Sequence, residues 1–170
     1  MAEPERLPSG RRLAVAAPSL DRIPVGTRVP AVLYAHDCGG PGPEAVAWGE
    51  RLSREGYAVI APDSSARSDG ATARCPTSGA AALATRQAEI RYALRQIRPL
   101  SWVRQSAVFL LAVGEGAAAA ARDDTWDVAG TISIGEPARA GRRPALTLER
   151  RADDPGNGPV VDFLRRLTPR

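Results

Sequence analysis

With 170 residues, 44% of them hydrophobic and 25% charged, the chain has the composition of one globular domain and is too apolar for wholesale disorder. Its apolar runs are all shorter than the roughly 20 residues that a membrane-spanning helix requires. The net charge is +4 at pH 7, and all 23 basic residues are arginines. These arginines are dispersed, with no run longer than a pair, and no nucleic-acid-binding motif is visible, which argues against a nucleic-acid-binding surface.

The first 28 residues are rich in proline, arginine and glycine, and they predict a loosely ordered segment ahead of a folded domain at residues 29–170. One short apolar stretch, residues 13–17, is a candidate edge strand. The charges near the N-terminus are not followed by the apolar segment of a secretory signal, so the sequence favours a cytoplasmic protein.

Residues 29–61 predict a strand, a helix and a second strand, which together make a βαβ unit. The near-continuous apolar runs at 29–35 and 57–61 are typical of strands that are buried on both faces of a parallel sheet. Between them, a glycine-rich loop leads into Pro43, which suits the first turn of a helix. Apolar residues at helical spacing then continue to about residue 55.

The middle of the chain continues this alternation of helices and strands. A long polar loop, residues 64–80, precedes a helix whose apolar positions recur at helical spacing between residues 83 and 97. Residues 107–113 predict a third buried strand. This strand turns sharply at Gly114-Glu115-Gly116 into a short alanine-rich helix, residues 117–121.

The last part of the chain predicts two more strands, at 128–134 and 145–148, and a helix at 160–167 with one apolar side. Strands that alternate with helices throughout the chain indicate an α/β fold. We therefore expect a three-layer α/β/α sandwich around a mostly parallel sheet.

Ligands of parallel sheets bind beyond the carboxyl ends of the strands, and two of those ends are distinctive here. One predicted strand ends at His36-Asp37-Cys38-Gly39-Gly40, and a later one ends at the tight turn around Gly114. The loop can offer backbone N–H groups to an oxyanion, and the turn can lift a nucleophile above the sheet. The two ends are therefore the frame of an acyl-transfer site.

Three stretches in this order resemble the dienelactone hydrolase family of the α/β-hydrolase fold. They are the loop HDCGG at residues 36–40, the segment at 48–65, and the small-residue turn AVGEG at 112–116. The resemblance covers about residues 28–136 well. It implies a sheet of the α/β-hydrolase type that is shortened at its C-terminal end.

The resemblance also places the family's catalytic positions, and it implies that two of the three lack the necessary group. The nucleophile position holds Gly114, which has no side chain that could attack. The only histidine, His36, matches a structural histidine of the oxyanion loop and not the base. The acid position falls on Asp153, which has nothing to orient without the other two groups. We therefore expect a hydrolase fold without ester-cleaving machinery and without a cofactor.

Three classes of function stay open on the sequence. The first is a non-catalytic protein that binds a small molecule or a protein partner at the strand ends, with His36, Cys38 and Glu115 as candidate binding residues. The second is an active hydrolase of carboxylic esters or lactones, either with an unorthodox nucleophile, such as Cys38 or Ser64, or with a site assembled with residues from another chain. The third is an interaction module with an arginine-rich surface, which has no positive signature. The oligomeric state is open.

Several of these residues allow a plainer interpretation. Cys38 and Cys75 follow strands that are neighbours in the hydrolase order, so a disulfide and two separate thiols are both candidates. His36 with Cys38 is too small a set for a metal site. Glu115 suits the start of a helix, where a carboxylate is favoured. Three serines that follow the second interior strand suit a turn better than a catalytic role: Ser64, Ser65 and Ser68.

Overall fold

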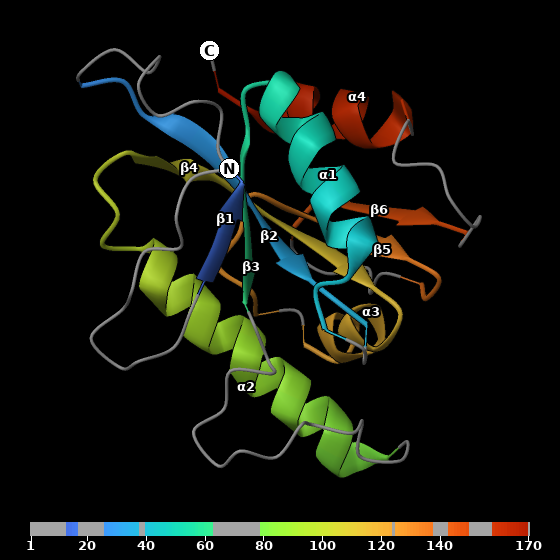
Figure 1. Ribbon diagram of the computed structural model, residues 1–170. Helices are drawn as coiled ribbons and strands as arrows, with labels where there is room; N and C mark the ends of the chain where they lie inside the picture. Colours follow the sequence, from blue (N-terminus) through green and yellow to red (C-terminus); the bar gives the residue numbers. More distant parts are fainter. Residues whose placement is uncertain are drawn as a thin grey trace.

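A computed structural model of the chain describes seven stretches, and for the first of them the backbone alone. They are residues 13–16, 26–37, 40–62, 79–123, 125–137, 143–149 and 158–169. Within these stretches, one six-stranded sheet has helices on both of its faces (Figure 1).

Strands and helices alternate from β2 to β5, whereas no described helix separates β1 from β2 or β5 from β6. The strands are β1 (Leu13–Ala16), β2 (Val29–Ala35), β3 (Ala58–Pro62), β4 (Val103–Val113), β5 (Gly130–Ile134) and β6 (Ala145–Leu148). The helices are α1 (Pro43–Arg54), α2 (Ala80–Ile97), α3 (Glu115–Ala120) and α4 (Gly158–Leu167).

The strands lie in the order β1-β3-β2-β4-β5-β6. All neighbouring strands are parallel except β1, which pairs antiparallel with β3 at one edge of the sheet. The predicted α/β fold with a mostly parallel sheet is therefore confirmed. The short apolar stretch near the N-terminus forms an edge strand, as its sequence suggested.

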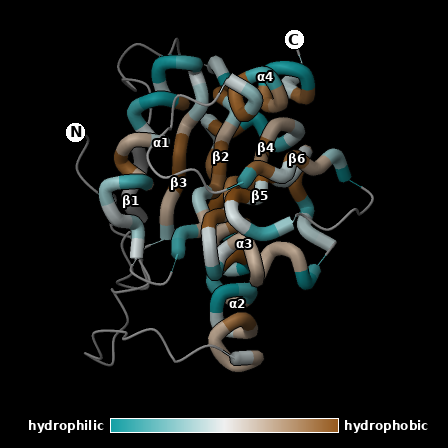
Figure 2. The backbone as a smooth tube through the Cα atoms, turned by 90° about the vertical axis from the view of Figure 1, so that its right-hand side faces the viewer, coloured by the Kyte–Doolittle hydropathy of each residue, from teal (hydrophilic) through white to brown (hydrophobic). Residues whose placement is uncertain are grey.

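Side chains of the central strands alternate between two apolar cores, one on each face of the sheet. On one face, α2 and α3 cover a core in which Ile90 of α2 packs with Leu110 of β4. On the other face, α1 and α4 cover a core that joins Leu52, Leu164 and Phe109 of β4. Burial on both faces explains why these strands read as near-continuous apolar runs. Figure 2 shows β2 and β3 as mostly hydrophobic segments of the backbone.

Some strand boundaries differ from the prediction. β3 runs from Ala58 to Pro62 and not over residues 57–61. β4 begins at Val103 and not at residue 107, because its first part is polar and an apolar pattern does not mark it. β5 begins at Gly130 and not at residue 128, because the N–H of Val128 bonds the Trp126 carbonyl in a turn. Among the described helices, none is long and apolar enough to cross a bilayer.

The register of the central strands determines which loops meet. Ala35 at the end of β2 pairs with Ala112 of β4, and Val113 of β4 pairs with Ile134 of β5. The residues after β2 and the turn after β4 consequently lie together at the carboxyl edge of the sheet.

Candidate functional site

The turn between β4 and α3 is built on Gly114. Its backbone lies at φ +54° and ψ −120°, in a region that side-chain-bearing residues rarely adopt. The Gly114 N–H donates to the Ile134 carbonyl oxygen at 3.2 Å, which fastens the turn to the neighbouring strand. A strained strand-to-helix turn of this kind exposes the nucleophile in α/β-hydrolases. Here the turn is present without the side chain.

The Asp37 carboxyl group fills the place where a side chain of residue 114 would begin. A Cβ atom added to Gly114 would lie 2.5 Å from Cγ and Oδ2 of Asp37 and 2.7 Å from its Oδ1. These distances are too short for a Cβ atom, so a side chain at residue 114 and the Asp37 carboxyl group in its present position cannot coexist. The space at the turn is therefore occupied by a polar group.

The same carboxylate accepts a hydrogen bond from the start of α3. The backbone N–H of Glu115 donates to Oδ1 of Asp37 at 3.1 Å. In the nucleophile turn of α/β-hydrolases, the N–H of the residue after the nucleophile is one of the oxyanion donors. Sequence reasoning did not single out Asp37, although its place in the loop beside the predicted turn was a signal that could have found it.

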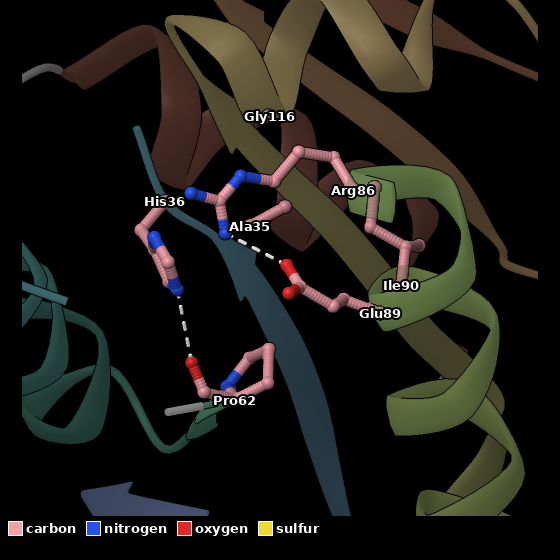
Figure 3. A pocket seen from close by; sticks show the side chains of 7 residues that line it. All are labelled: Ala35, His36, Pro62, Arg86, Glu89, Ile90 and Gly116. Carbon is pink, nitrogen blue, oxygen red and sulfur yellow. Dashed lines mark hydrogen bonds and ion pairs between the residues drawn. The ribbon is translucent and has the colours of Figure 1, made fainter. Parts of the chain in front are cut away.

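His36 is buried, with 3% of its surface exposed, and its ring lies against main-chain carbonyl groups. Its Nδ1 is 2.6 Å from the carbonyl oxygen of Asp37, and its Nε2 is 3.1 Å from that of Pro62. Because carbonyl oxygens only accept hydrogen bonds, the ring N–H of either tautomer donates to one of these two main-chain carbonyls. This arrangement ties the end of β2 to the end of β3 (Figure 3).

Glu115 belongs to a small ionic cluster with α2. Its Oε2 lies 3.9 Å from Nε of Arg86, and Nη1 of Arg86 donates to Oε2 of Glu89 at 2.7 Å. Arg86 is buried and reaches from α2 towards the end of β2 (Figure 3). A buried guanidinium needs such carboxylate partners, so the cluster holds α2 against the start of α3.

A small pocket lies between this cluster and the end of β2. Its volume is about 10 Å³, which is room for about one water molecule. It is lined by Ala35, His36, Pro62, Arg86, Glu89, Ile90 and Gly116 (Figure 3). Among the described residues, no group of three histidine, cysteine or acidic side chains could hold a metal ion.

The described part of the chain brings Gly114, Glu115 and His36 to one edge of the sheet. The other predicted site residues lie outside the described residues. This set includes both cysteines of the candidate disulfide, the acid position and the serines: Cys38, Cys75, Asp153, Ser64, Ser65 and Ser68. Their predicted roles stay predictions.

Solved structures with the α/β-hydrolase fold are similar to this chain. Est1E from Butyrivibrio proteoclasticus, solved with ferulic acid bound, aligns with a TM-score of 0.55 and 17% identity over 74% of this chain and 49% of that chain. A candidate dienelactone hydrolase from Klebsiella pneumoniae aligns with a TM-score of 0.55 and 15% identity over 92% of this chain and 74% of that chain. The α/β-hydrolase GrgF from a Penicillium species aligns with a TM-score of 0.53 and 17% identity over 77% of this chain and 44% of that chain.

These similarities establish the fold. The chain has an α/β-hydrolase fold and resembles esterases and a dienelactone hydrolase in structure. It spans about half the length of Est1E and GrgF. No family model and no curated protein matches the sequence. The expected resemblance is thus confirmed at the level of the fold.

Proposed function

We propose that this chain is a dienelactone-hydrolase-like protein that does not hydrolyse esters, and that it acts by binding a small molecule or a protein partner at the carboxyl edge of its sheet. One observation carries the proposal. The turn has the strained backbone of a nucleophile turn, but its residue is Gly114, and the Asp37 carboxylate fills the place of the missing side chain.

Acyl transfer needs three groups, and each is compromised in this chain. The nucleophile position has no oxygen or sulfur. The single histidine directs its ring nitrogens to the main-chain carbonyls of Asp37 and Pro62, so it does not serve as the base. The N–H of Glu115 already donates to Asp37, which leaves it unavailable to an oxyanion.

The chemical class of the ligand is suggested by a structural neighbour. Est1E has been solved with bound ferulic acid, an aromatic carboxylic acid. The pocket at the end of β2 has room for about one water molecule, so ferulic acid would have to bind with further residues, with Cys38 and Asp153 as the candidates. Ferulic acid is therefore the probe that we would titrate first, by calorimetry and by the shift of the melting temperature.

The proposal is tested with p-nitrophenyl acetate and with a fluorophosphonate probe. We expect no turnover above that of buffer and no stoichiometric adduct by mass spectrometry, because no activated oxygen or sulfur stands at the turn. An adduct, or turnover that survives repurification, would refute the proposal.

An active hydrolase with an unorthodox nucleophile is the second candidate. The observation in its favour is that a carboxylate does stand at the turn, and carboxylates serve as nucleophiles in some enzymes. Turnover that is abolished by Asp37→Asn and retained by Cys38→Ala and Ser64→Ala would select Asp37. Loss in Cys38→Ala or Ser64→Ala would select that residue instead.

A further inference from the structure

Asp37 and Gly114 occupy equivalent places on neighbouring strands. Ala35 of β2 pairs with Ala112 of β4, and each of the two residues lies two positions beyond its member of that pair. Parallel pairing therefore brings them side by side, although they are far apart in the chain. The contact is a consequence of strand register and not of loop conformation alone.

Moving the Asp37 carboxylate aside breaks the hydrogen bond that holds it. On its side chain, Oδ1 accepts the N–H of Glu115, and a partly buried N–H left without an acceptor is unfavourable. On its backbone, the carbonyl oxygen of Asp37 accepts from the Gly40 N–H at 3.3 Å and lies 2.6 Å from Nδ1 of His36. Both ends of the residue are thus held in place.

We infer that Asp37 is an internal blocking residue: its carboxyl group, held by the N–H of Glu115, occupies the space of a side chain at position 114, so that a nucleophile introduced at Gly114 alone has to displace it. This inference rests on the proposed function only for the meaning of position 114 as the nucleophile position. The inference goes beyond the proposed function, because it attributes the lack of a nucleophile at the turn to two residues, Gly114 and Asp37, and gives Asp37 a role.

A double-mutant cycle tests the inference without any measurement of turnover. Gly114→Ala is introduced into the wild-type chain and into the Asp37→Ala chain, and urea unfolding gives the equilibrium constant of each. The strain of a side chain at positive φ is common to both backgrounds and cancels. We expect Gly114→Ala to raise the unfolding constant about tenfold more in the wild-type background than in the Asp37→Ala background.

Two controls separate the steric clash between Asp37 and a side chain at position 114 from the effects of positive φ and of the Asp37 charge. Gly56 also has a positive φ, +87°, but an added Cβ there would meet no atom within 4 Å. Gly56→Ala should therefore have the same effect in both backgrounds. Asp37→Asn removes the charge but keeps the volume, so Gly114→Ala in that background should be as damaging as in the wild type.

Equal effects of Gly114→Ala in the wild-type and Asp37→Ala backgrounds would overturn the inference. If Gly114→Ala alone does not fold, recovery of a folded chain by the added Asp37→Ala supports it, and failure of the double variant to fold overturns it. If the wild-type chain hydrolyses esters but Gly114→Ala is more damaging in the wild-type than in the Asp37→Ala background, only the proposed function is refuted. If the wild-type chain is inactive but Gly114→Ala has the same effect in both backgrounds, only this inference is refuted.

Discussion

Gly116 has no room for a side chain because α3 begins directly against the end of β2. An added Cβ would lie 2.8 Å from the Ala35 carbonyl carbon and 2.9 Å from the His36 carbonyl oxygen, and it would overlap the Ala35 carbonyl oxygen. These are backbone atoms of a central strand, so they cannot give way as a flexible side chain could. The glycine is required by close packing, whereas Gly114 is required both by its φ and by the neighbouring carboxylate.

Gly116→Ala is expected to destabilise the protein by about 2–3 kcal/mol, since overpacking against a rigid backbone forces a shift of α3. Urea unfolding measures the change. Gly158→Ala is the matched control, because an added Cβ at this helical position would meet nothing within 4 Å. The control should change stability by less than about 1 kcal/mol. Similar losses in both variants would contradict this account of Gly116.

Arg86→Ala is expected to destabilise the protein by about 2 kcal/mol, because it leaves two partly buried carboxylates, Glu89 and Glu115, without their cation. The exposed pair of Arg54 and Glu50 provides the comparison, since both side chains are more than half exposed. Arg54→Ala should have an effect below about 0.5 kcal/mol. Chemical denaturation of both variants at the same ionic strength checks the difference.

At the scale of elements, the segment after α3 is held to α2 by a compact set of contacts. Arg91 of α2 pairs with Asp123, and its guanidinium lies 5.4 Å from the ring centroid of Trp126. The indole N–H of Trp126 donates to the Ala120 carbonyl oxygen at 3.0 Å, which caps the end of α3. This set positions α3 at its C-terminal end, as Gly116 does at its beginning.

The ion pair between Arg91 and Asp123 is sensitive to acid because of the pKa of Asp123. Burial by itself raises the pKa of this carboxyl, but hydrogen bonds from Thr125 and the contact with Arg91 outweigh it and hold the pKa below its usual value. A carboxyl with a lowered pKa stabilises the fold above its unfolded pKa of about 4 and ceases to do so as the pH falls through the folded pKa. Asp123→Asn should therefore destabilise the chain more at pH 7 than at pH 3, as urea unfolding at the two pH values would show. An equal loss at both would contradict the assignment.

At the scale of the whole molecule, the two cores share one sheet and should unfold together. Trp48 is buried in the core beneath α1 and α4, and Trp126 is buried in the core beneath α2 and α3. Because β2 and β4 contribute side chains to both cores, neither core can lose its sheet while the other keeps it. The molecule should therefore behave as one cooperative unit.

The cooperativity of unfolding can be tested on both faces of the sheet with Ile90→Ala and Leu164→Ala. Each removes a nearly fully buried side chain, and each should destabilise the protein by about 2–5 kcal/mol. In both variants, tryptophan fluorescence and far-UV circular dichroism should report the same unfolding midpoint. Val46→Ala, at an exposed position of α1, should change stability by less than about 0.5 kcal/mol. Separate midpoints for the two probes would show that the cores unfold independently.

The predictability of the fold follows from burial. The apolar runs that became β2, β3 and most of β4 are visible because both faces of these strands are covered, which removes polar residues from them. The polar beginning of β4 was missed for the same reason, since Gln105 and its neighbours are not buried on both faces. The contacts that Asp37 and Arg86 make with Glu115 depend on strand register and on the placement of α2. A local sequence pattern contains neither.

The amino-acid order alone determined that position 114 is a glycine, that the chain has one histidine and that strands alternate with helices. Only the tertiary structure decided what stands at the turn. The pairing of β2 with β4 brings Asp37 next to Gly114, and the N–H of Glu115, 78 residues away in the chain, holds its carboxylate there. Proximity of this kind comes from strand register, which is a property of the assembled sheet and not of any segment by itself.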